Sequence, residues 1–266
     1  MKRGRSVSHI LEKQYFDCID DRGNCFIIYR AELHYLCINI HYSELVFCDS
    51  EDVTTGKSSL KKTIKPESGK ILKYFNTSLE IKGSWKRIDN LLPSYSFRDS
   101  ESKELIWNCH HPKTNTEIDY RGTRFTGYGY AETLLLSIKP FNLPLDEIRW
   151  GRFLSDEYSV IWMRWKGAFP LNKLYCNGVE YNDAEYGENS LNFHGGVYQL
   201  AFQEIATIRN GKLKSLFSKF PWMKIFFKKS ILNTTENKYK SKSLLIYDKK
   251  VTATGWSIYE IVTWKS

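Results

Sequence analysis

The stretch 121–167 constrains the fold most, because it combines closely spaced glycines with large aromatic side chains. Alternate residues of a strand share a face. Tyr128, Tyr130 and Glu132 therefore fall on one face of the first predicted strand. The opposite face carries only small residues, namely Gly127, Gly129, Ala131 and Thr133. Small residues let another backbone or a bound ligand approach closely, so this strand is predicted to border a covered space.

Two further strands follow in the same stretch. Trp150 and Arg152 share one face of the first of these strands, and Arg149 and Phe153 share the other. The second strand, 160–165, alternates in the same way and directs Trp162 to one face. All three strands thus point aromatic rings and arginines toward space that other parts of the chain must cover.

Composition and turn spacing predict an all-β chain. Aromatic residues make up 15% of the 266 residues, with 17 Tyr, 15 Phe and 8 Trp, which favours strands and suffices for a core. The runs 14–19 and 25–31 flank a turn rich in Gly and Asn, which is a hairpin signal. Short runs separated by turns are typical of an antiparallel barrel or sandwich, in one large domain or two smaller ones.

Three segments are predicted to interrupt the strand pattern. Residues 49–70 are polar and predict a loop, and His110 and His111 before Pro112 predict a turn. Residues 212–232 carry apolar positions at helical spacing with lysines between them, which predicts one short helix. That helix would pack over a barrel mouth, act as a lid, or lie on an anionic membrane.

The formal net charge of +9 favours anionic partners, but no known nucleic-acid module is visible, so no nucleic-acid partner is expected. No run reaches the roughly 18 apolar residues of a spanning helix, and the basic start lacks the apolar run of a signal peptide. We therefore expect a cytoplasmic protein with reduced, mostly packed cysteines, and with 212–232 as its candidate membrane contact.

Metal and cofactor motifs are absent from the sequence. It contains no HExxH pattern and no spaced Cys/His set, so no metal site is expected. The glycines between 122 and 129 match neither a phosphate-binding loop nor a dinucleotide fingerprint, so no cofactor is expected either.

The motif Tyr128-Gly129-Tyr130, followed by a carboxylate and later by Arg149-Trp150-Gly151-Arg152, resembles the signature of the carotenoid 1,2-hydratase family (hydroxyneurosporene synthases). Relatives of that family share a double lipocalin-like fold and include fungal Diels–Alderases. The opening Gln14-Tyr15-Phe16 is similar to the family's first strand. The resemblance implies two consecutive lipocalin-like barrels, residues 1–120 and 121–266, with an apolar cavity between or within them.

The resemblance also implies a reaction. Hydratases of the family are thought to protonate a carbon–carbon double bond with an Asp and to hold the carbocation with aromatic rings. Their motif has a His-Asp pair where this chain has Ala131 and Glu132, so Glu132 alone is carried over, as the acid position. The polar run that follows in the family is replaced here by Thr133-Leu134-Leu135.

The residues themselves support two interpretations of Glu132. A carboxyl group among Tyr128, Tyr130 and Trp162 would have its pKa raised by desolvation and could act as a general acid. In this interpretation Tyr130, Trp150 and Trp162 shape the pocket, and Arg152 orients Glu132 or a substrate oxygen.

In the second interpretation, Glu132 forms a structural ion pair with Arg152 or Arg149, because buried charges are usually paired. Glu260, which shares a face with Trp256 and Trp264 in the closing strand, has the same two interpretations. Tyr128, Trp150, Trp162, Arg149 and Glu260 are the predicted substrate-binding residues.

The sequence thus predicts a cofactor-independent enzyme that acts on a hydrophobic small molecule such as a polyene, a terpenoid or a polyketide-like compound. The reaction would be a hydration, a cyclisation or an isomerisation, performed by Glu132, Tyr130 and Arg152. The alternatives are a non-catalytic carrier of a lipid or pigment, and a peripheral membrane protein.

Overall fold

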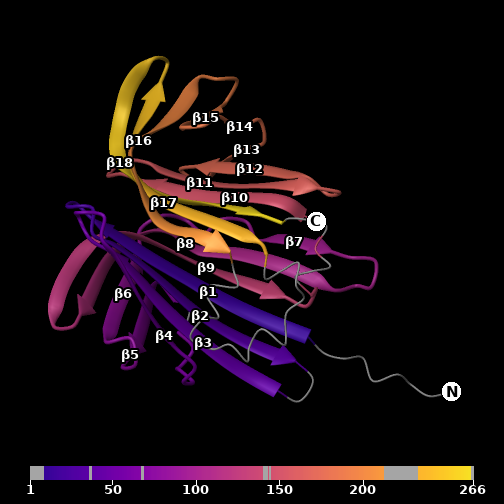
Figure 1. Cartoon of the computed structure of the whole chain (residues 1–266). Coiled ribbons are helices and arrows are strands. Elements are labelled where there is room, and N and C mark those ends of the chain that lie inside the picture. The colour runs from indigo at the N-terminus through magenta and orange to yellow at the C-terminus, as the bar shows by residue number, and fades with distance from the viewer. Residues whose placement is uncertain are drawn as a thin grey trace. The chain divides into compact units, whose positions relative to one another are not determined.

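The computed structural model in Figure 1 describes residues 9–35, 38–66, 69–139, 143, 145–212 and 233–264. Within these ranges the chain forms eighteen strands and no helix. The helix predicted for 212–232 lies, from residue 213 onward, outside the described residues. A search of the described residues finds no helix suited to crossing a membrane.

The first sheet is antiparallel, and its nine described strands follow the order β4-β3-β2-β1-β9-β8-β6-β5, with β7 also beside β8. Their bounds are β1 His9–Asp20, β2 Cys25–Tyr35, β3 Ile38–Cys48, β4 Thr54–Ser59, β5 Ile71–Asn76, β6 Ile81–Arg87, β7 Tyr95–Arg98, β8 Glu104–Tyr120 and β9 Thr123–Leu136. The sheet is strongly curled, and a cluster around Phe16, Phe26 and Trp85 fills one of its faces.

The second sheet is also antiparallel and curled, and its described strands follow the order β13-β12-β11-β10-β18-β17-β16-β15-β14. Their bounds are β10 Leu145–Leu154, β11 Ser159–Gly167, β12 Leu171–Cys176, β13 Val179–Tyr181, β14 Glu185–Tyr186, β15 Ser190–Phe193, β16 Tyr198–Lys212, β17 Thr235–Tyr247 and β18 Lys250–Thr263. A core around Phe153, Trp162 and Phe193 fills one face. The all-β, double lipocalin-like prediction is therefore confirmed.

The chain divides into two compact units between Asn142 and Leu143, with Ser50–Val53 grouped with the second unit. The sequence placed this division after residue 120. That position is instead the tip of a hairpin, because Arg121 and Gly122 both have positive φ angles, of 54° and 80°, between β8 and β9. Such angles are typical of tight hairpin turns. The strand β9 then pairs with β1 and β8 and completes the first sheet.

The turn predicted at His110, His111 and Pro112 is wrong, because these residues lie within the long strand β8. The register of β8 against β9 shifts twice, between Asn108 and His111 and between His111 and Thr114. On its other edge β8 pairs with β7 up to Trp107 and with β6 from Thr114 onward. The proline therefore lies where neither β6 nor β7 uses the edge, which is the position that a strand tolerates for a residue without an N–H.

Two further local predictions concern the first hairpin and the polar loop at 49–70. The hairpin of β1 and β2 is confirmed in full register, with Gln14 opposite Arg30. The polar loop at 49–70 contains the short strand β4, which pairs with β3 although its residues are polar. A sheet edge needs little burial on either face, so hydrophobic alternation does not mark such a strand.

The predicted faces of β9 are confirmed. Ala131 belongs to the core cluster of the first unit, whereas Tyr130 and Glu132 point to the opposite face. The glycines on the core side are required by the backbone of β1. A Cβ atom added at Gly127 would lie 2.0 Å from the carbonyl oxygen of Ile19, and one at Gly129 would lie 2.4 Å from that of Asp17.

We expect Gly127→Ala to lower the free energy of unfolding by about 1–3 kcal/mol, because its Cβ atom would meet main-chain atoms that cannot rotate away. Urea denaturation followed by circular dichroism measures this. Gly56→Ala in β4 is the matched control, since its Cβ atom would meet its nearest neighbour at 3.9 Å. Equal stability of the two variants would contradict the prediction.

Candidate functional site

Glu132 on β9 holds two hydrogen bonds at one carboxylate oxygen. The Nε1–H of Trp107 donates to Oε2 at 2.5 Å, and the hydroxyl of Tyr130 donates to the same atom at 2.6 Å. Trp107 reaches this carboxylate from the neighbouring strand β8, and Tyr130 reaches it from two residues earlier on the same face. The two donors fix the orientation of the carboxylate and stabilise its charged form.

Aromatic rings surround this carboxylate on the β1 side. Tyr15 pairs in register with Glu132. The ring of Tyr15 lies edge-on to those of Tyr130 and Tyr29, with centroids 6.0 Å and 5.4 Å apart. Such separations and angles are favourable for aromatic pairs. Sequence analysis associated Glu132 with Tyr130, but it did not associate Tyr15, Tyr29 or Trp107 with this carboxylate.

The groups behind Glu132 stay protonated at neutral pH. Burial raises the pKa of the Tyr130 hydroxyl well above its ordinary value, and Cys109 and Glu132 raise it further. Burial likewise raises the pKa of the Cys109 thiol, which is hydrogen-bonded to Tyr130. Tyr130 is thus available as a donor to Glu132. Cys109, Tyr130, Glu132 and Trp107 form one continuous hydrogen-bonded row, called here the Glu132 row.

Tyr128 lies on the same face of β9 as Tyr130, two residues earlier. The ammonium group of Lys113 stands 5.1 Å from the centre of the Tyr128 ring. Lys113 is buried, so this cation–π contact compensates part of its desolvation. The contact gives Tyr128 a structural role that the sequence did not predict.

The predicted arginines belong to the second unit. Arg152 on β10 is fully buried, and its guanidinium donates to the carbonyl oxygen of Trp256 at 2.9 Å. Arg149 donates to Glu147 at 2.9 Å. Burial alone would raise the pKa of Glu147, but the hydrogen bonds from Lys166 and Arg149 hold it below its ordinary value. Arg149 is therefore engaged in a local ion pair.

The other predicted residues of the second unit have separate surroundings. Trp162 is part of the apolar core and packs against Gly151, where a Cβ atom would lie 2.3 Å from the indole. The prediction that Trp162 stands with Tyr128 and Tyr130 around one carboxyl is wrong, because it fills the core of the other sheet. Trp150, on the opposite face of β10, is buried opposite Glu260 on β18.

Glu260 forms an ion pair with Lys238, whose side chain is almost completely buried. Lys238 also lies 3.5 Å from Glu236, which is itself 3.8 Å from Arg209. A buried ammonium needs such carboxylate partners. The structural interpretation of Glu260 is thus the one that the geometry supports.

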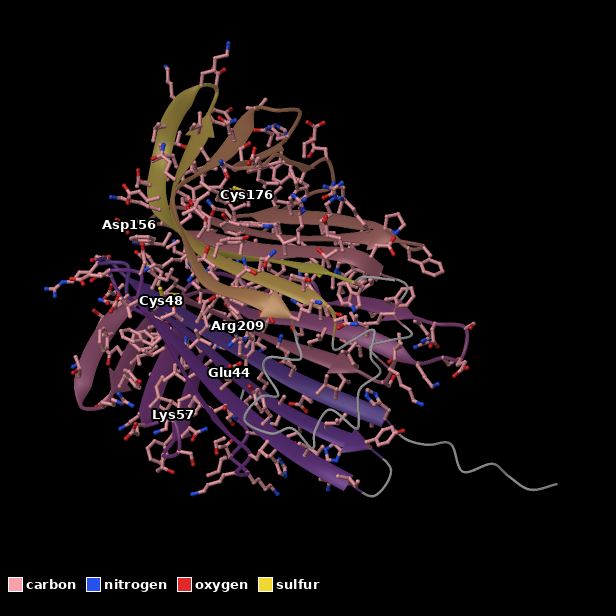
Figure 2. The ribbon with its side chains drawn as sticks, viewed as in Figure 1. Glu44, Cys48, Lys57, Asp156, Cys176 and Arg209 are labelled. Atoms are coloured by element: carbon pink, nitrogen blue, oxygen red, sulfur yellow. The ribbon has the colours of Figure 1, made fainter. Side chains whose placement is uncertain are left out.

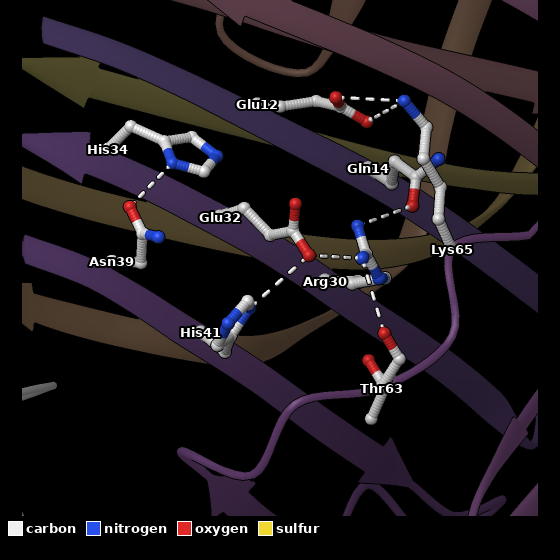
Figure 3. Close-up of polar contacts among 9 residues, drawn as sticks. All are labelled: Glu12, Gln14, Arg30, Glu32, His34, Asn39, His41, Thr63 and Lys65. Carbon is white, nitrogen blue, oxygen red and sulfur yellow. Dashed lines mark hydrogen bonds and ion pairs between the residues drawn. The ribbon is translucent and has the colours of Figure 1, made fainter.

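Sequence reasoning missed a polar network on the core-facing side of the first sheet, which Figure 3 shows in close-up. Arg30 on β2, only 2% exposed, donates to Gln14 at 3.3 Å, to Glu32 at 2.6 Å and to the carbonyl oxygen of Thr63 at 3.3 Å. His41 lies 3.2 Å from the same carboxylate. We call these five residues the Arg30 network.

The Arg30 network stands directly above the aromatic core. Gln14 lies two residues before Phe16 and Arg30 two residues after Ile28, so each shares a strand face with that core residue. Nearby, Lys65 pairs with Glu12 at 2.7 Å. The Nε of Arg30 is buried without a hydrogen-bond partner among the described residues, so it can donate to an oxygen atom of a bound molecule.

His110 and His111 form a second buried polar pair, on β8. Their Nδ1 atoms are 2.7 Å apart, so one ring must donate and the other accept, and His110 Nε2 lies 3.1 Å from the Thr133 hydroxyl. Burial lowers the pKa of each ring to about 4, helped by the positive charge of Arg87. Both rings are therefore neutral at physiological pH.

Metal-ligating groups do not gather in the described part of the chain. No set of three or more His, Cys, Asp and Glu side chains is arranged there to hold an ion. Five described cysteines, at 18, 25, 48, 109 and 176, are buried, and Figure 2 labels Cys48 and Cys176 among them. Their burial agrees with the expected packed, reduced cysteines.

Comparison with known proteins supports the fold. No family model and no curated protein matches this chain. An AttH candidate from Nitrosomonas europaea superposes with a TM-score of 0.57 at 7% identity, covering 98% of this chain and 94% of that one. CghA superposes with a TM-score of 0.52 at 10% identity, covering 97% and 89%, and was also solved with Sch210972. At such identities the likeness shows the fold alone, and the chain is a double lipocalin-like β protein.

We expect Arg30→Met to lower the free energy of unfolding by about 3 kcal/mol, because it leaves Glu32 without its buried cation. Arg98→Met is the matched control, since it breaks the exposed pair with Glu104 and should change stability by less than about 1 kcal/mol. Chemical denaturation of both variants measures the difference. A cost for Arg30→Met no larger than that for Arg98→Met would contradict a buried ion pair.

The histidine pair predicts a pH dependence. The pKa of each ring is lowered to about 4, so the unfolded chain takes up protons below its ordinary pKa of 6.5 while the folded chain does not. Stability contributed by the neutral pair is therefore present above pH 6.5 and is lost as the pH falls toward 4. The measurement is the urea midpoint at pH 7 and at pH 5.

Between pH 7 and pH 5, the urea midpoint of the double variant His110→Gln/His111→Asn should fall by less than that of the wild type, whatever the stability of the variant at pH 7. His194→Asn, which changes an exposed histidine of the second unit, should fall as the wild type does. If the urea midpoint falls by the same amount in all three proteins, the pair is not buried in its neutral form.

Proposed function

We propose that this protein is an enzyme that acts on a mostly apolar, unsaturated small molecule by moving a proton through Glu132. The substrate class is a polyene, a terpenoid or a polyketide-like compound, and the reaction is a hydration, a cyclisation or an isomerisation. The observation that carries the proposal is the oriented carboxylate of Glu132, held at Oε2 by Trp107 and Tyr130 beside buried aromatic rings.

The arrangement suits proton transfer to carbon. A protonated Glu132 would give its proton to one carbon of a double bond, whose π electrons form the new C–H bond and leave a cation on the neighbouring carbon. The faces of Tyr15 and Tyr130 can stabilise that positive charge. The carboxylate left behind keeps the two hydrogen bonds at Oε2, which stabilise its charge at that moment.

The second half of the reaction returns the proton. If water adds to the cation, its surplus proton goes back to Glu132 and the product is an alcohol. If a carbon next to the cation instead loses a proton to Glu132, the double bond has moved. If a second double bond attacks the cation, the new C–C bond closes a ring and leaves the positive charge on another carbon, whose neighbour then loses a proton to Glu132. No electrons are gained or lost in any of these reactions, so the proposal requires no cofactor.

Residues of the first unit suffice for this proposal. Tyr130 is both an orienting donor and part of the aromatic wall, and its raised pKa keeps it a donor throughout. Trp107 is a positioning residue, since it acts on the carboxylate. The roles predicted for Arg152 and Trp162 are not part of it, because the carbonyl of Trp256 engages Arg152 and the core of the second unit holds Trp162.

The decisive variant is Glu132→Gln, whose amide oxygen can still accept the bonds from Trp107 and Tyr130 but whose nitrogen cannot exchange a proton. The ligand is first identified by native mass spectrometry and organic extraction of the protein purified from its own source. Consumption of that compound by the purified protein is then followed by liquid chromatography and mass spectrometry.

We expect Glu132→Gln to lower kcat by about 10²–10⁴-fold, as for the loss of a general acid, with the dissociation constant changed less than about threefold. Glu101→Gln, at an exposed carboxylate, is the control and should keep full activity. Binding without turnover by the wild type would favour the carrier of a lipid or pigment. Turnover that survives Glu132→Gln would show that another residue moves the proton.

A further inference from the structure

The first unit carries a groove of about 690 Å³ that is separate from the Glu132 row. Its lining includes outward-facing side chains of β5, β6, β8 and β9, together with the segment 64–66 that leads toward β5. On β5 the groove exposes Ile71, Lys73 and Phe75, while Leu72 and Tyr74 between them point into the core.

The apolar side chains of this groove are unusually exposed. Ile64 is 89% exposed, Phe75 62% and Ile71 46%. Single exposed hydrophobic residues are common on protein surfaces, but neighbouring ones that line the same hollow mark a binding surface. A volume of this size is also within the range of small-molecule sites.

Basic side chains accompany these apolar ones. Lys82 on β6 is the direct cross-strand partner of Phe75, and Lys73 stands opposite Ser84 on the same face. Neither lysine forms an ion pair within the part of the chain that the structure describes. Asp119 on β8 stands opposite Lys82 and offsets part of its charge, so the charge of Lys73 and the remainder of that of Lys82 are available to a ligand next to the exposed ring of Phe75.

The acidic side chains of the groove are held by other groups. Glu117 pairs with Arg124 at 2.7 Å, and Asp119 accepts the backbone N–H of Gly122 at 3.0 Å. Because Arg124 pairs with Glu117 and Lys65 pairs with Glu12, the charges that remain in the groove are those of Lys73 and Lys82 against that of Asp119, and this balance favours an anion.

We propose that this groove binds a small amphipathic anion, such as an alkyl or aryl carboxylate or sulfate. Its apolar body lies along Ile64, Ile71 and Phe75, and its anionic group lies between Lys73 and Lys82. The combination of a hollow, exposed apolar side chains and two lysines without an ion pair among the described residues matches both ends of such a molecule. The proposal does not depend on the reaction proposed for Glu132.

The test is isothermal titration calorimetry of the full chain with dodecanoate, at concentrations at which this probe is monomeric. We expect the wild type to bind, and Lys73→Gln/Lys82→Gln to weaken binding about tenfold through the loss of two charge contacts. Phe75→Ser should weaken it by a similar factor through the loss of apolar contact. Dodecanamide, which has the same chain without the charge, should bind the wild type about tenfold more weakly than dodecanoate.

The control is Lys242→Gln/Lys250→Gln, which removes two exposed lysines of the second unit and should leave the affinity unchanged. No binding of dodecanoate by the wild type, or equal binding by all variants, would overturn the proposal. Binding only to phosphatidylglycerol vesicles, lost in the Lys73/Lys82 variant, would also overturn it and make the groove a membrane surface. The Glu132→Gln turnover result is independent of each of these outcomes.

Discussion

The close approach of β1 to β9 is the constraint on which the first unit depends. Added Cβ atoms at Gly127 and Gly129 would lie within 2.4 Å of carbonyl oxygens of β1, so the two strands can lie this close only where β9 lacks side chains. The same pairing places Glu132 beside Tyr15 on the opposite face. The strand β9 thus needs small residues on its core side, while aromatic and acidic residues lie on its other side.

The core-facing side of this sheet is divided into an aromatic part and a polar part. Aromatic residues such as Phe16 and Trp85 pack at one level, and the Arg30 network lies at the next. A guanidinium in this position loses its hydration, and the hydrogen bonds that it donates to Glu32, Gln14 and the backbone replace part of it. The arrangement is consistent with a curled sheet whose apolar core occupies only part of its concave side, leaving the remainder to hydrogen-bonded polar groups.

Much of this could be predicted from the sequence. Alternation on β9 and β10 gave the correct faces for Tyr130, Glu132 and Arg152, because the period of a strand is fixed by covalent geometry. The passage of β8 through Pro112 could not be predicted, since it depends on which edge β6 and β7 leave unused. The Arg30 network could have been found, because Arg30 has the same parity as Phe26 and Ile28. The groups that fill the space above such an arginine could not be predicted. They come in part from β3 and from the segment near Thr63, which are distant in the sequence.

Glu132 and Glu260 show why a carboxylate in a strand pattern does not by itself define a site. Both lie on long strands among aromatic residues, and the same two interpretations, acid or structural ion pair, were open for each from the sequence alone. Glu260 meets the buried ammonium of Lys238, which compensates its charge and binds it into a structural pair. The hydrogen bonds at Oε2 of Glu132 come from the neutral donors Trp107 and Tyr130, which orient the carboxylate without bringing a full charge to that atom. A carboxylate held in this way keeps more of its capacity to exchange a proton than one held by an ammonium, because neutral donors stabilise the charged form less. At these oxygen atoms the two glutamates therefore differ in the charge of the donor, which only the three-dimensional structure supplies.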